Sequence, residues 1–405
     1  MSKKLPIIFL LITVMIDSMG IGLIMPVMPE LIIELGGGDL SRAATWGGGL
    51  AAIFAVMQFL FGPIIGNLSD RYGRRPVLLL SLAVMALDYV IMGFANAMWL
   101  LVVGRLIGGI TSATQSTANA YMADISESDQ KAQNFGLVGA AFGVGFILGP
   151  LAGGLLSTFG PRAPFFAAAA LATANTIFGA FILPETVTDK IRRPFSWTRA
   201  NPFAAFKYIG KLPGVSRLLV AYFFYNIAFF VYPSVWAYYT QERFGWDATM
   251  VGVSLAVFGA SMALVQGGLI RLVIPRIGEH YTVVIGLGIN ILAFTIYALA
   301  FEGWQIFALA PITSLGAITG PALQGIMSRA AKSNQQGELQ GVLTSISAIG
   351  IIISPVMMTS TFSYFTRAGT PYYFPGAPFV LSAGLVLLSL VIFAGRERLH
   401  SYKPD

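Results

Sequence analysis

Long uninterrupted apolar runs constrain this 405-residue chain more than any other feature. A helix needs about 20 apolar residues to cross the hydrocarbon core of a bilayer. Only helices and closed barrels satisfy every backbone polar group in lipid, and barrel strands are only about 9–11 residues long. The pattern therefore predicts an all-α membrane protein with twelve transmembrane helices, at 5–34, 44–67, 76–96, 98–124, 134–158, 163–183, 216–240, 248–272, 281–301, 304–328, 338–362 and 375–395.

Composition supports this class and excludes others. The chain is 56% hydrophobic and 11% charged, whereas a soluble domain averages about 25% charged residues. It has no cysteine, which excludes disulfides, thiolate metal sites and thiol catalysis. It also has no phosphate-binding loop of the GxxxxGK[ST] type, no histidine-containing metal cluster and no nucleophile–base set. We therefore expect neither an enzyme nor a bound cofactor or metal, with a proton gradient as the energy source.

The distribution of basic residues predicts the topology. With the N-terminus inside, twenty of the 25 Lys and Arg residues fall on the cytoplasmic side and four, Arg42, Arg162, Arg243 and Arg367, fall outside. This bias follows the positive-inside rule and predicts that both termini are cytoplasmic. Because the basic residues lie in loops between apolar runs, the net charge of +7 indicates membrane lipids and not nucleic acid as the partner.

An internal repeat divides the chain into halves. The segment AQNFGLVGAAFGVGFILGPLAG begins at Ala132, and the similar segment GELQGVLTSISAIGIIISPVMM begins 205 residues later. The longest polar stretch, 184–215, lies between them and includes NPFAAFKYIGKL, which is typical of a helix on the membrane surface. We predict an N-terminal six-helix bundle (1–183), a cytoplasmic linker (184–215) and a C-terminal six-helix bundle (216–405), with a site between the bundles.

Three charged residues, Asp17, Asp88 and Arg105, lie well inside predicted spans, away from their ends. A charge near the bilayer centre costs about 2.5–3.5 kcal/mol even on insertion scales, so such residues face protein or water. Burial favours the neutral form of a carboxyl, whereas a nearby guanidinium favours the charged form. We expect Asp17 to carry protons with Arg105 as its modulator. A static ion pair that fixes helix packing is the alternative, and it is a stronger one for Asp88.

Uncharged polar and aromatic side chains in the spans are candidate substrate contacts. A polar side chain in a span can bind cargo, or it can join helices at about 1 kcal/mol. Aromatic side chains of the seventh span can form a wall against a flat hydrophobic molecule, or they can face lipid. The predicted contacts are Gln58, Gln115, Asn119, Asn226, Phe230, Tyr232, Trp236, Asn290 and Gln324.

Two motifs resemble a known family. The loop GNLSDRYGRR resembles GxxxDRxGRR, the signature loop of the major facilitator superfamily, which latches the cytoplasmic side. The matching residues are Gly66, Asp70, Arg71, Gly73, Arg74 and Arg75. The string GFILGPLAGG in span five is similar to the antiporter motif of the drug/proton antiporter branch, with Gly145, Gly149, Pro150, Gly153 and Gly154. Small residues there let helices approach closely, and the proline bends the span.

Within that superfamily the chain is most similar to the tetracycline/proton antiporters. The stretches IDSMGIGLIMPVMPEL, ALDYVIMGFA, GRLIGGITSATQSTANAYMADI and PALQGIMSRAAKSNQQGELQG carry the resemblance, which covers both halves. It implies a monomer in a bacterial inner membrane that uses Asp17, Asp88 and Arg105 to bind and couple. In place of that group's acid, histidine and glutamine, this chain has Asn290, Met262 and Phe230. Since Asn and Met do not titrate near neutral pH, proton coupling must rest on the first half, and tetracycline is doubtful as the natural cargo.

Taken together, these features predict a proton-coupled efflux antiporter for a small lipophilic, drug-like compound, working by alternating access. Two alternatives stay open on the sequence. One is an uptake or facilitated transporter of a metabolite on the same fold. The other is a membrane receptor or scaffold that keeps the fold without moving a substrate.

Overall fold

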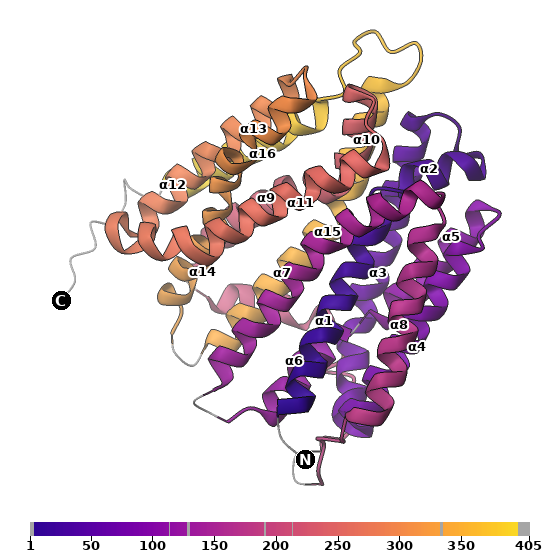
Figure 1. Ribbon diagram of the computed structural model, residues 1–405. Helices are drawn as coiled ribbons and strands as arrows, with labels where there is room; N and C mark the ends of the chain where they lie inside the picture. Colours follow the sequence, from indigo (N-terminus) through magenta and orange to yellow (C-terminus); the bar gives the residue numbers. More distant parts are fainter. Residues whose placement is uncertain are drawn as a thin grey trace. The chain divides into compact units, whose positions relative to one another are not determined.

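The computed structural model describes residues 4–112, 114–127, 130–189, 192–212, 214–332 and 335–395. Helices are the regular secondary structure throughout these ranges (Figure 1). Ten helices in the described residues are long and apolar enough to cross a membrane, and one of them, Ala248–Leu299, has the 52 residues needed for two crossings. The long helix counts as two crossings, and the successive helices Met98–Thr111 and Thr114–Ile125 together form one more. The fold is therefore the predicted all-α arrangement of twelve spans.

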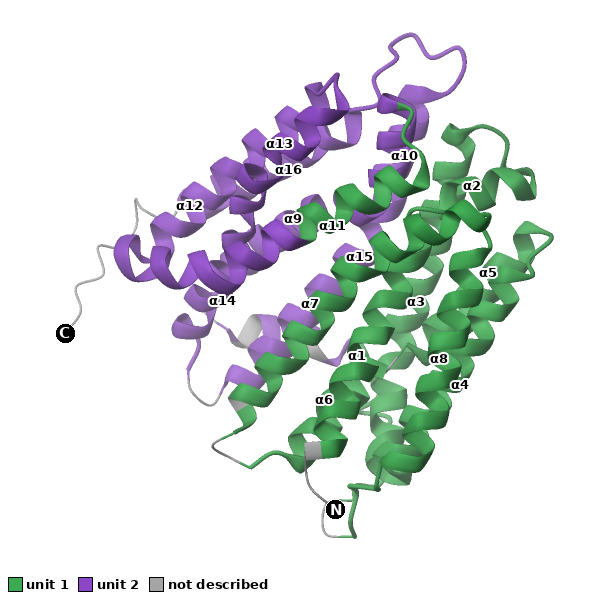
Figure 2. Cartoon of the chain, viewed as in Figure 1, with its two compact units in different colours: residues 1–202, 245–259 green, residues 203–244, 260–405 purple. Residues whose placement is uncertain are grey.

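The chain forms two compact units (Figure 2). Unit 1 comprises residues 1–202 and 245–259, and unit 2 comprises residues 203–244 and 260–405. Unit 1 contains α1 (Lys4–Ile24), α2 (Met28–Ile32), the π-helix η1 (Ile33–Gly37), α3 (Leu40–Tyr72), α4 (Arg74–Gly93), α5 (Met98–Thr111), α6 (Thr114–Ile125), α7 (Lys131–Leu156), the 3-10 helix η2 (Ser157–Phe159), α8 (Ala163–Ile182) and most of α11 (Ala248–Leu264).

Unit 2 begins with the predicted surface helix, which is a short 3-10 helix. Its elements are η3 (Ala204–Lys211), α9 (Ser216–Phe229), α10 (Val231–Phe244), the end of α11, the π-helix η4 (Val265–Leu269), α12 (Ile270–Leu299), α13 (Gly303–Thr313), the 3-10 helix η5 (Ser314–Ile318), α14 (Thr319–Ala330), α15 (Gln336–Thr366) and α16 (Ala377–Ala394).

Proline and glycine explain where helices depart from the predicted spans. The first span was predicted to run to residue 34, but α1 ends at Ile24 because Pro26 cannot donate a backbone hydrogen bond. Pro29 then lies in the first turn of α2, where a missing N–H is tolerated. In unit 2, Gly278 takes φ +77° and breaks α12 between the two crossings that the sequence predicts.

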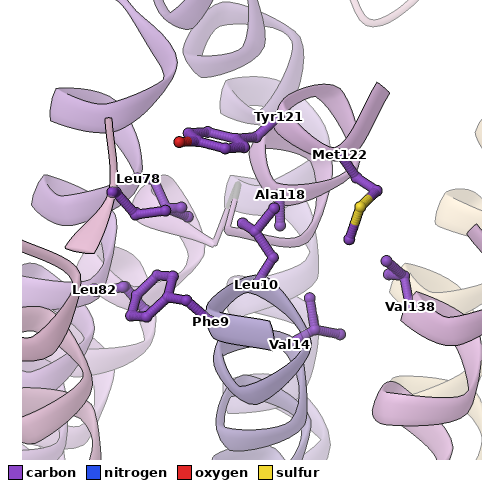
Figure 3. Close-up of a cluster of buried hydrophobic side chains, with 10 residues drawn as sticks. Phe9, Leu10, Val14, Leu78, Leu82, Ala118, Tyr121, Met122 and Val138 are labelled. Atoms are coloured by element: carbon purple, nitrogen blue, oxygen red, sulfur yellow. The ribbon is translucent and has the colours of Figure 1, made fainter. Parts of the chain in front are cut away.

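The core of unit 1 joins α1 to α4, α6 and α7 (Figure 3). Its apolar side chains are almost fully buried: Phe9, Leu10, Val14, Leu78, Leu82, Ala118, Tyr121, Met122, Val138 and Leu183. Tyr121 brings a polar hydroxyl group into this apolar cluster. The hydroxyl donates a hydrogen bond of 2.6 Å to the Pro184 carbonyl. The cluster therefore fixes the first span against three neighbours and also holds the segment that follows α8.

Candidate functional site

Asp88 lies in a slot made by two glycines of α5. Its side chain is 3% exposed. A Cβ atom added to Gly104 would lie 2.6 Å from Asp88 Oδ1, and one added to Gly108 would lie 2.5 Å from Oδ2. Only glycine at these two positions leaves room for the carboxyl group. Arg105 belongs to the same turn of α5, and its charge acts on the Asp88 carboxyl.

Arg105 completes a buried charge centre that lacks a full set of hydrogen bonds. Its Nη2 lies 2.7 Å from Met92 Sδ, and its Cζ lies 5.5 Å from the centre of the Phe54 ring. A thioether is a weak acceptor, and a ring face attracts a cation. Among the described residues, Arg105 Nε and Asp88 Oδ1 have no hydrogen-bond partner. The centre is therefore electrostatically paired but able to accept a further polar partner.

Asp17 has a different environment from the one predicted. No ion pair joins Arg105 to Asp17 among the described residues, and Asp88 is the carboxyl group that lies in the glycine slot beside Arg105. Asp17 is half-buried on α1, and no hydrogen bond or ion pair joins it to any residue that the structure describes. It is thus a carboxyl group inside a membrane-spanning helix whose charge is not compensated by a neighbouring side chain.

Tyr89 lies near both carboxyl groups and was not among the residues predicted from the sequence. The charges of Asp17, Asp88 and Arg105 all act on its hydroxyl group. The hydroxyl contacts Gly20, one turn beyond Asp17, so closely that a Cβ there would overlap it. A tyrosine next to a carboxylate within an apolar run, as in the string ALDYV, was the available signal.

The glycines of the antiporter motif hold α7 against the backbone of α1. Gly145, Gly149 and Gly153 recur every four residues, so they share one face of α7. Each would place a Cβ against a carbonyl of α1, and for Gly149 the distance to Met19 O is 2.6 Å. Gly154 faces α11 instead, where Thr249 donates a hydrogen bond of 3.0 Å to its carbonyl. The motif therefore sets the position of the turn of α1 that carries Asp17.

The α1–α7 crossing gives a testable prediction. We expect Gly149→Ala to lower the free energy of unfolding by about 1–3 kcal/mol, since the added Cβ meets rigid backbone. The matched control is Gly139→Ala on the same helix, where a Cβ would meet nothing within 4 Å. Thermal unfolding of the purified variants in detergent measures the difference. Equal unfolding midpoints for the two variants would contradict the close-packing interpretation.

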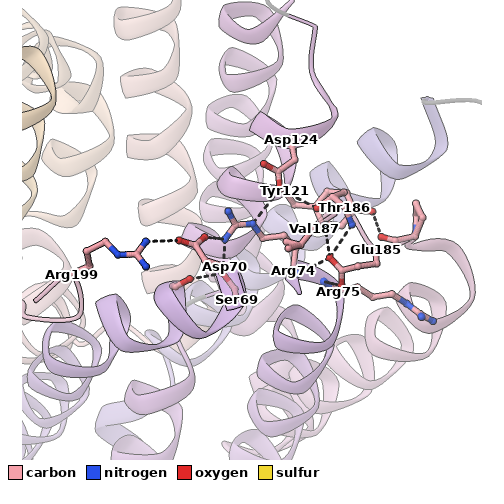
Figure 4. A network of polar contacts seen from close by, with 12 residues as sticks. Ser69, Asp70, Arg74, Arg75, Tyr121, Asp124, Glu185, Thr186, Val187 and Arg199 are labelled. Carbon is pink, nitrogen blue, oxygen red and sulfur yellow. Dashed lines mark hydrogen bonds and ion pairs between the residues drawn. The ribbon is translucent and has the colours of Figure 1, made fainter. Parts of the chain in front are cut away.

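The signature loop forms a polar network at the turn between α3 and α4 (Figure 4). Arg74 Nη1 lies 2.5 Å from Asp70 Oδ1, and Arg74 Nε lies 3.2 Å from Asp124 Oδ2 on α6. Arg199, from the segment after α8, brings its Nη1 to 3.6 Å from Asp70 Oδ2. Arg74 thus joins the α3–α4 turn to α6, and Asp70 joins the same turn to the segment after α8.

Glu185 belongs to the same network, although the sequence analysis placed it in a linker. Its carboxylate accepts hydrogen bonds from the backbone N–H groups of Arg74 (2.9 Å) and Arg75 (3.2 Å) at the start of α4. A carboxylate at this end of a helix is favoured by the helix dipole. Gly73 has φ +114°, and the Glu185 carboxylate occupies the space that a Cβ atom would need. Both observations explain why this position is a glycine.

The other loop residues lie outside the network's centre. Arg75 donates a hydrogen bond of 2.7 Å to the Ala180 carbonyl. Arg71 stacks over Tyr72 at 5.0 Å, and a Cβ at Gly66 would meet nothing within 4 Å. Arg75 therefore joins the start of α4 to α8, whereas the contacts given for Arg71 and Gly66 are local.

In unit 2 the structure brings Asn226 and Gln324 into one uncharged cluster. Gln324 Nε2 donates a hydrogen bond of 3.1 Å to the Tyr222 hydroxyl, which lies 3.2 Å from Ser347 Oγ. Ser347 in turn donates to Asn226 Oδ1 over 3.4 Å. The cluster connects α9, α14 and α15, and its central member, Tyr222, was not among the contacts predicted from the sequence.

Three other candidates of unit 2 are used for packing. Asn290 is 1% exposed, and its amide donates to the carbonyls of Gly286 (2.8 Å) and Gly316 (2.9 Å). Tyr232 and Trp236 are 5% and 2% exposed and belong to the aromatic core that also contains Tyr239, Phe294, Tyr297 and Phe379. The aromatic wall predicted for the seventh span is therefore interior packing, because α9 and α10 turn these rings toward α12 and α16.

The remaining candidates differ in how open they are. Phe230 is half-buried at the break between α9 and α10. Gln58 on α3 is exposed and Asn119 on α6 is half-buried, and neither makes a hydrogen bond within the described part of the chain. The side chain of Gln115 lies outside the described residues. In unit 1, Gln58, Asn119 and Asp17 are thus the predicted side chains that remain open to a ligand.

Comparison with known proteins supplies the family. The chain matches the sequence profile of the Major Facilitator Superfamily over residues 10–355. It is 38% identical over 390 residues to the tetracycline resistance protein, class C, of Escherichia coli, covering 96% of each chain, and 37% identical over 357 residues to the class B protein of Escherichia coli, covering 87% of this chain and 88% of the relative.

The fold is shared with solved transporters. A bacterial homologue of the human lysosomal transporter Spinster, in an inward-facing and occupied conformation, superposes with a TM-score of 0.78 at 17% identity, covering 98% of both chains. The twelve-span fold, the signature loop and the relatives agree with each other. The chain therefore belongs to the major facilitator superfamily, a family of multi-pass membrane transporters and not of enzymes, and it is related to the tetracycline resistance proteins.

Proposed function

We propose that the protein is an antiporter that exports a small lipophilic, drug-like compound in exchange for protons. The observation that carries this proposal is Asp17, a half-buried carboxyl group inside a membrane-spanning helix with no partner among the described residues. A charge held there without compensation is costly, so binding of a proton or of a polar substrate group relieves the cost. The drug-resistance names of the relatives support the direction and the class of cargo.

In this mechanism, proton and cargo compete for the unpaired carboxyl group. Asp17 releases its proton to the cytoplasm when cargo binds there, and it binds a new proton from the side of higher proton concentration when the cargo leaves. Tyr89 connects this event to the Asp88–Arg105 centre, because all three charges act on its hydroxyl group. Moving one proton across 100 mV provides about 2.3 kcal/mol, which sustains a roughly fiftyfold cargo gradient.

Alternating access of the two bundles supplies the movement. The Asp70–Arg74–Asp124 network stabilises the closed state on the cytoplasmic side, where we also place both termini. In unit 1, the uncharged side chains of Gln58 and Asn119 contact the cargo. Asn290 is held by backbone carbonyls and replaces the acid of the tetracycline/proton antiporters, which argues against tetracycline as the natural cargo.

The proposal is tested with purified protein in proteoliposomes. With a panel of lipophilic compounds, we expect cargo to accumulate inside vesicles whose lumen is acidic, so that protons flow outward, and we expect a pH change that depends on cargo. Flux that ignores the pH gradient would indicate a facilitated transporter instead. Cargo movement along the proton flow would indicate uptake, and ligand binding without any counterflow would indicate a receptor.

A further inference from the structure

The two halves of the chain can be aligned with an offset of 205 residues, and this alignment includes the turn before α4 and the turn that divides α12. Gly73 is then equivalent to Gly278, and both glycines have positive φ, +114° and +77°. The alignment also places Arg74 on Glu279 and Asp124 on Arg329. Arg74 and Glu279, which follow the two turns, therefore have opposite charges. Asp124 and Arg329, the equivalent residues on the neighbouring helices, also have opposite charges.

Each unit joins these two positions by an ion pair. In unit 1, Arg74 Nε lies 3.2 Å from Asp124 Oδ2. In unit 2, the Arg329 guanidinium pairs with the Glu279 carboxylate. The Glu279 side chain is 10% exposed, and a Cβ at Gly325, one turn before Arg329, would lie 2.7 Å from its Oε1. The carboxylate thus lies against α14, and the glycine provides its space.

The order of charges in unit 2 matches the helix dipoles. Glu279 begins the helical segment after Gly278, and Arg329 lies in the last turn of α14, so each charge faces the helix end that favours it. In unit 1 the order is opposed to the dipoles, and Glu185 supplies the negative charge at the start of α4. The unit 2 pair therefore works without the additional partners that Arg74 requires.

We propose that Glu279 and Arg329 form a second, charge-reversed clamp. It positions the second segment of α12 against α14, so that this part of unit 2 moves as one body during transport. Both are positioning residues, and they set the turnover rate and not the affinity for cargo. The statement about turnover rests on the transport function proposed above, whereas the statement about helix positioning does not.

Charge swaps test the clamp through transport. We expect Glu279→Gln and Arg329→Gln to lower Vmax about fivefold at unchanged KM. The reversals Glu279→Arg and Arg329→Glu should be more severe, and the double swap should recover part of the loss, because it restores the ion pair but opposes the helix dipoles. Arg276→Gln, an exposed arginine at the same turn, is the control. In unit 1, the double variant Arg74→Asp with Asp124→Arg should not recover transport. The carboxylate introduced at position 74 would lie next to the carboxylates of Asp70 and Glu185.

Cysteine labelling tests helix positioning without transport. The chain has no cysteine, so Met327→Cys, fully buried on α14, is a single reporter. We expect a water-soluble maleimide to label it several-fold faster in the Glu279→Gln background and slowly again in the double swap. An unchanged labelling rate in Glu279→Gln, or a double swap as poor as the reversals, overturns the clamp. If the intact protein moves no compound, the proposed transport function is wrong. The labelling rates still show whether Glu279 and Arg329 position the two helices.

Discussion

Asp17→Asn is expected to abolish cargo-driven proton movement, reducing it to the level of empty proteoliposomes. Asparagine has the shape of the carboxyl group but cannot bind or release a proton near neutral pH. Because Asp17 has no partner among the described residues, the substitution removes the titrating group without breaking an ion pair. The measurement is the pH change recorded by a dye inside the vesicles when cargo is added.

The control for this experiment is Asp189→Asn, a fully exposed carboxyl group outside the spans. It should keep the wild-type signal. The variant Asp88→Asn separates the two intramembrane carboxyl groups. If coupled flux survives in Asp17→Asn and disappears in Asp88→Asn, the proton site is the buried centre beside Arg105 and not α1.

Arg105→Met is expected to destabilise the protein by about 3 kcal/mol, near the lower end for breaking a buried charge pair. The substitution leaves the Asp88 carboxyl group, only 3% exposed, without its compensating charge. Uptake of a proton by Asp88 limits the loss. The free energy of unfolding in detergent, or the thermal midpoint at one pH, measures the effect.

The double variant Arg105→Met with Asp88→Asn provides the matched comparison. Removing both charges leaves no isolated carboxylate, so we expect it to be more stable than Arg105→Met alone. A double-mutant cycle then gives the interaction energy between the two sites. Strictly additive effects would show that Asp88 and Arg105 do not stabilise each other, and the buried centre would lose its physical basis.

Much of the fold was predictable because the membrane imposes a simple rule on the sequence. Runs of about 20 apolar residues must become helices, and the ten candidate spans of the described chain fall on the predicted runs. Breaks inside the runs were harder, since a proline only lowers the stability of a helix locally. Pro26 ends α1, for example, whereas Pro63, Pro150 and Pro355 lie inside continuous helices.

The site was predictable only where its residues are neighbours in the sequence. The motif DRYGRR indicated Asp70 and Arg74, which do pair. Glu185 and Asp124 were not predicted as their partners, because they come from segments 50 or more residues away. Likewise, a list of polar residues in spans could not distinguish Asn290, which joins helices, from Asn119, which stays open.

The sequence by itself determined that this is a membrane protein, that it is all-helical, that it contains an internal repeat and that it belongs to its superfamily. Each of these depends on composition or on residues close along the chain. Only the tertiary structure decided which carboxyl group lies beside Arg105, that Tyr89 lies near both carboxyls, and that ion pairs of opposite charge order hold equivalent turns in the two units. These contacts depend on how closely and at which turn two helices cross. Small residues such as Gly104, Gly108 and Gly149 control that approach, and their effect appears only when the facing helix is in place.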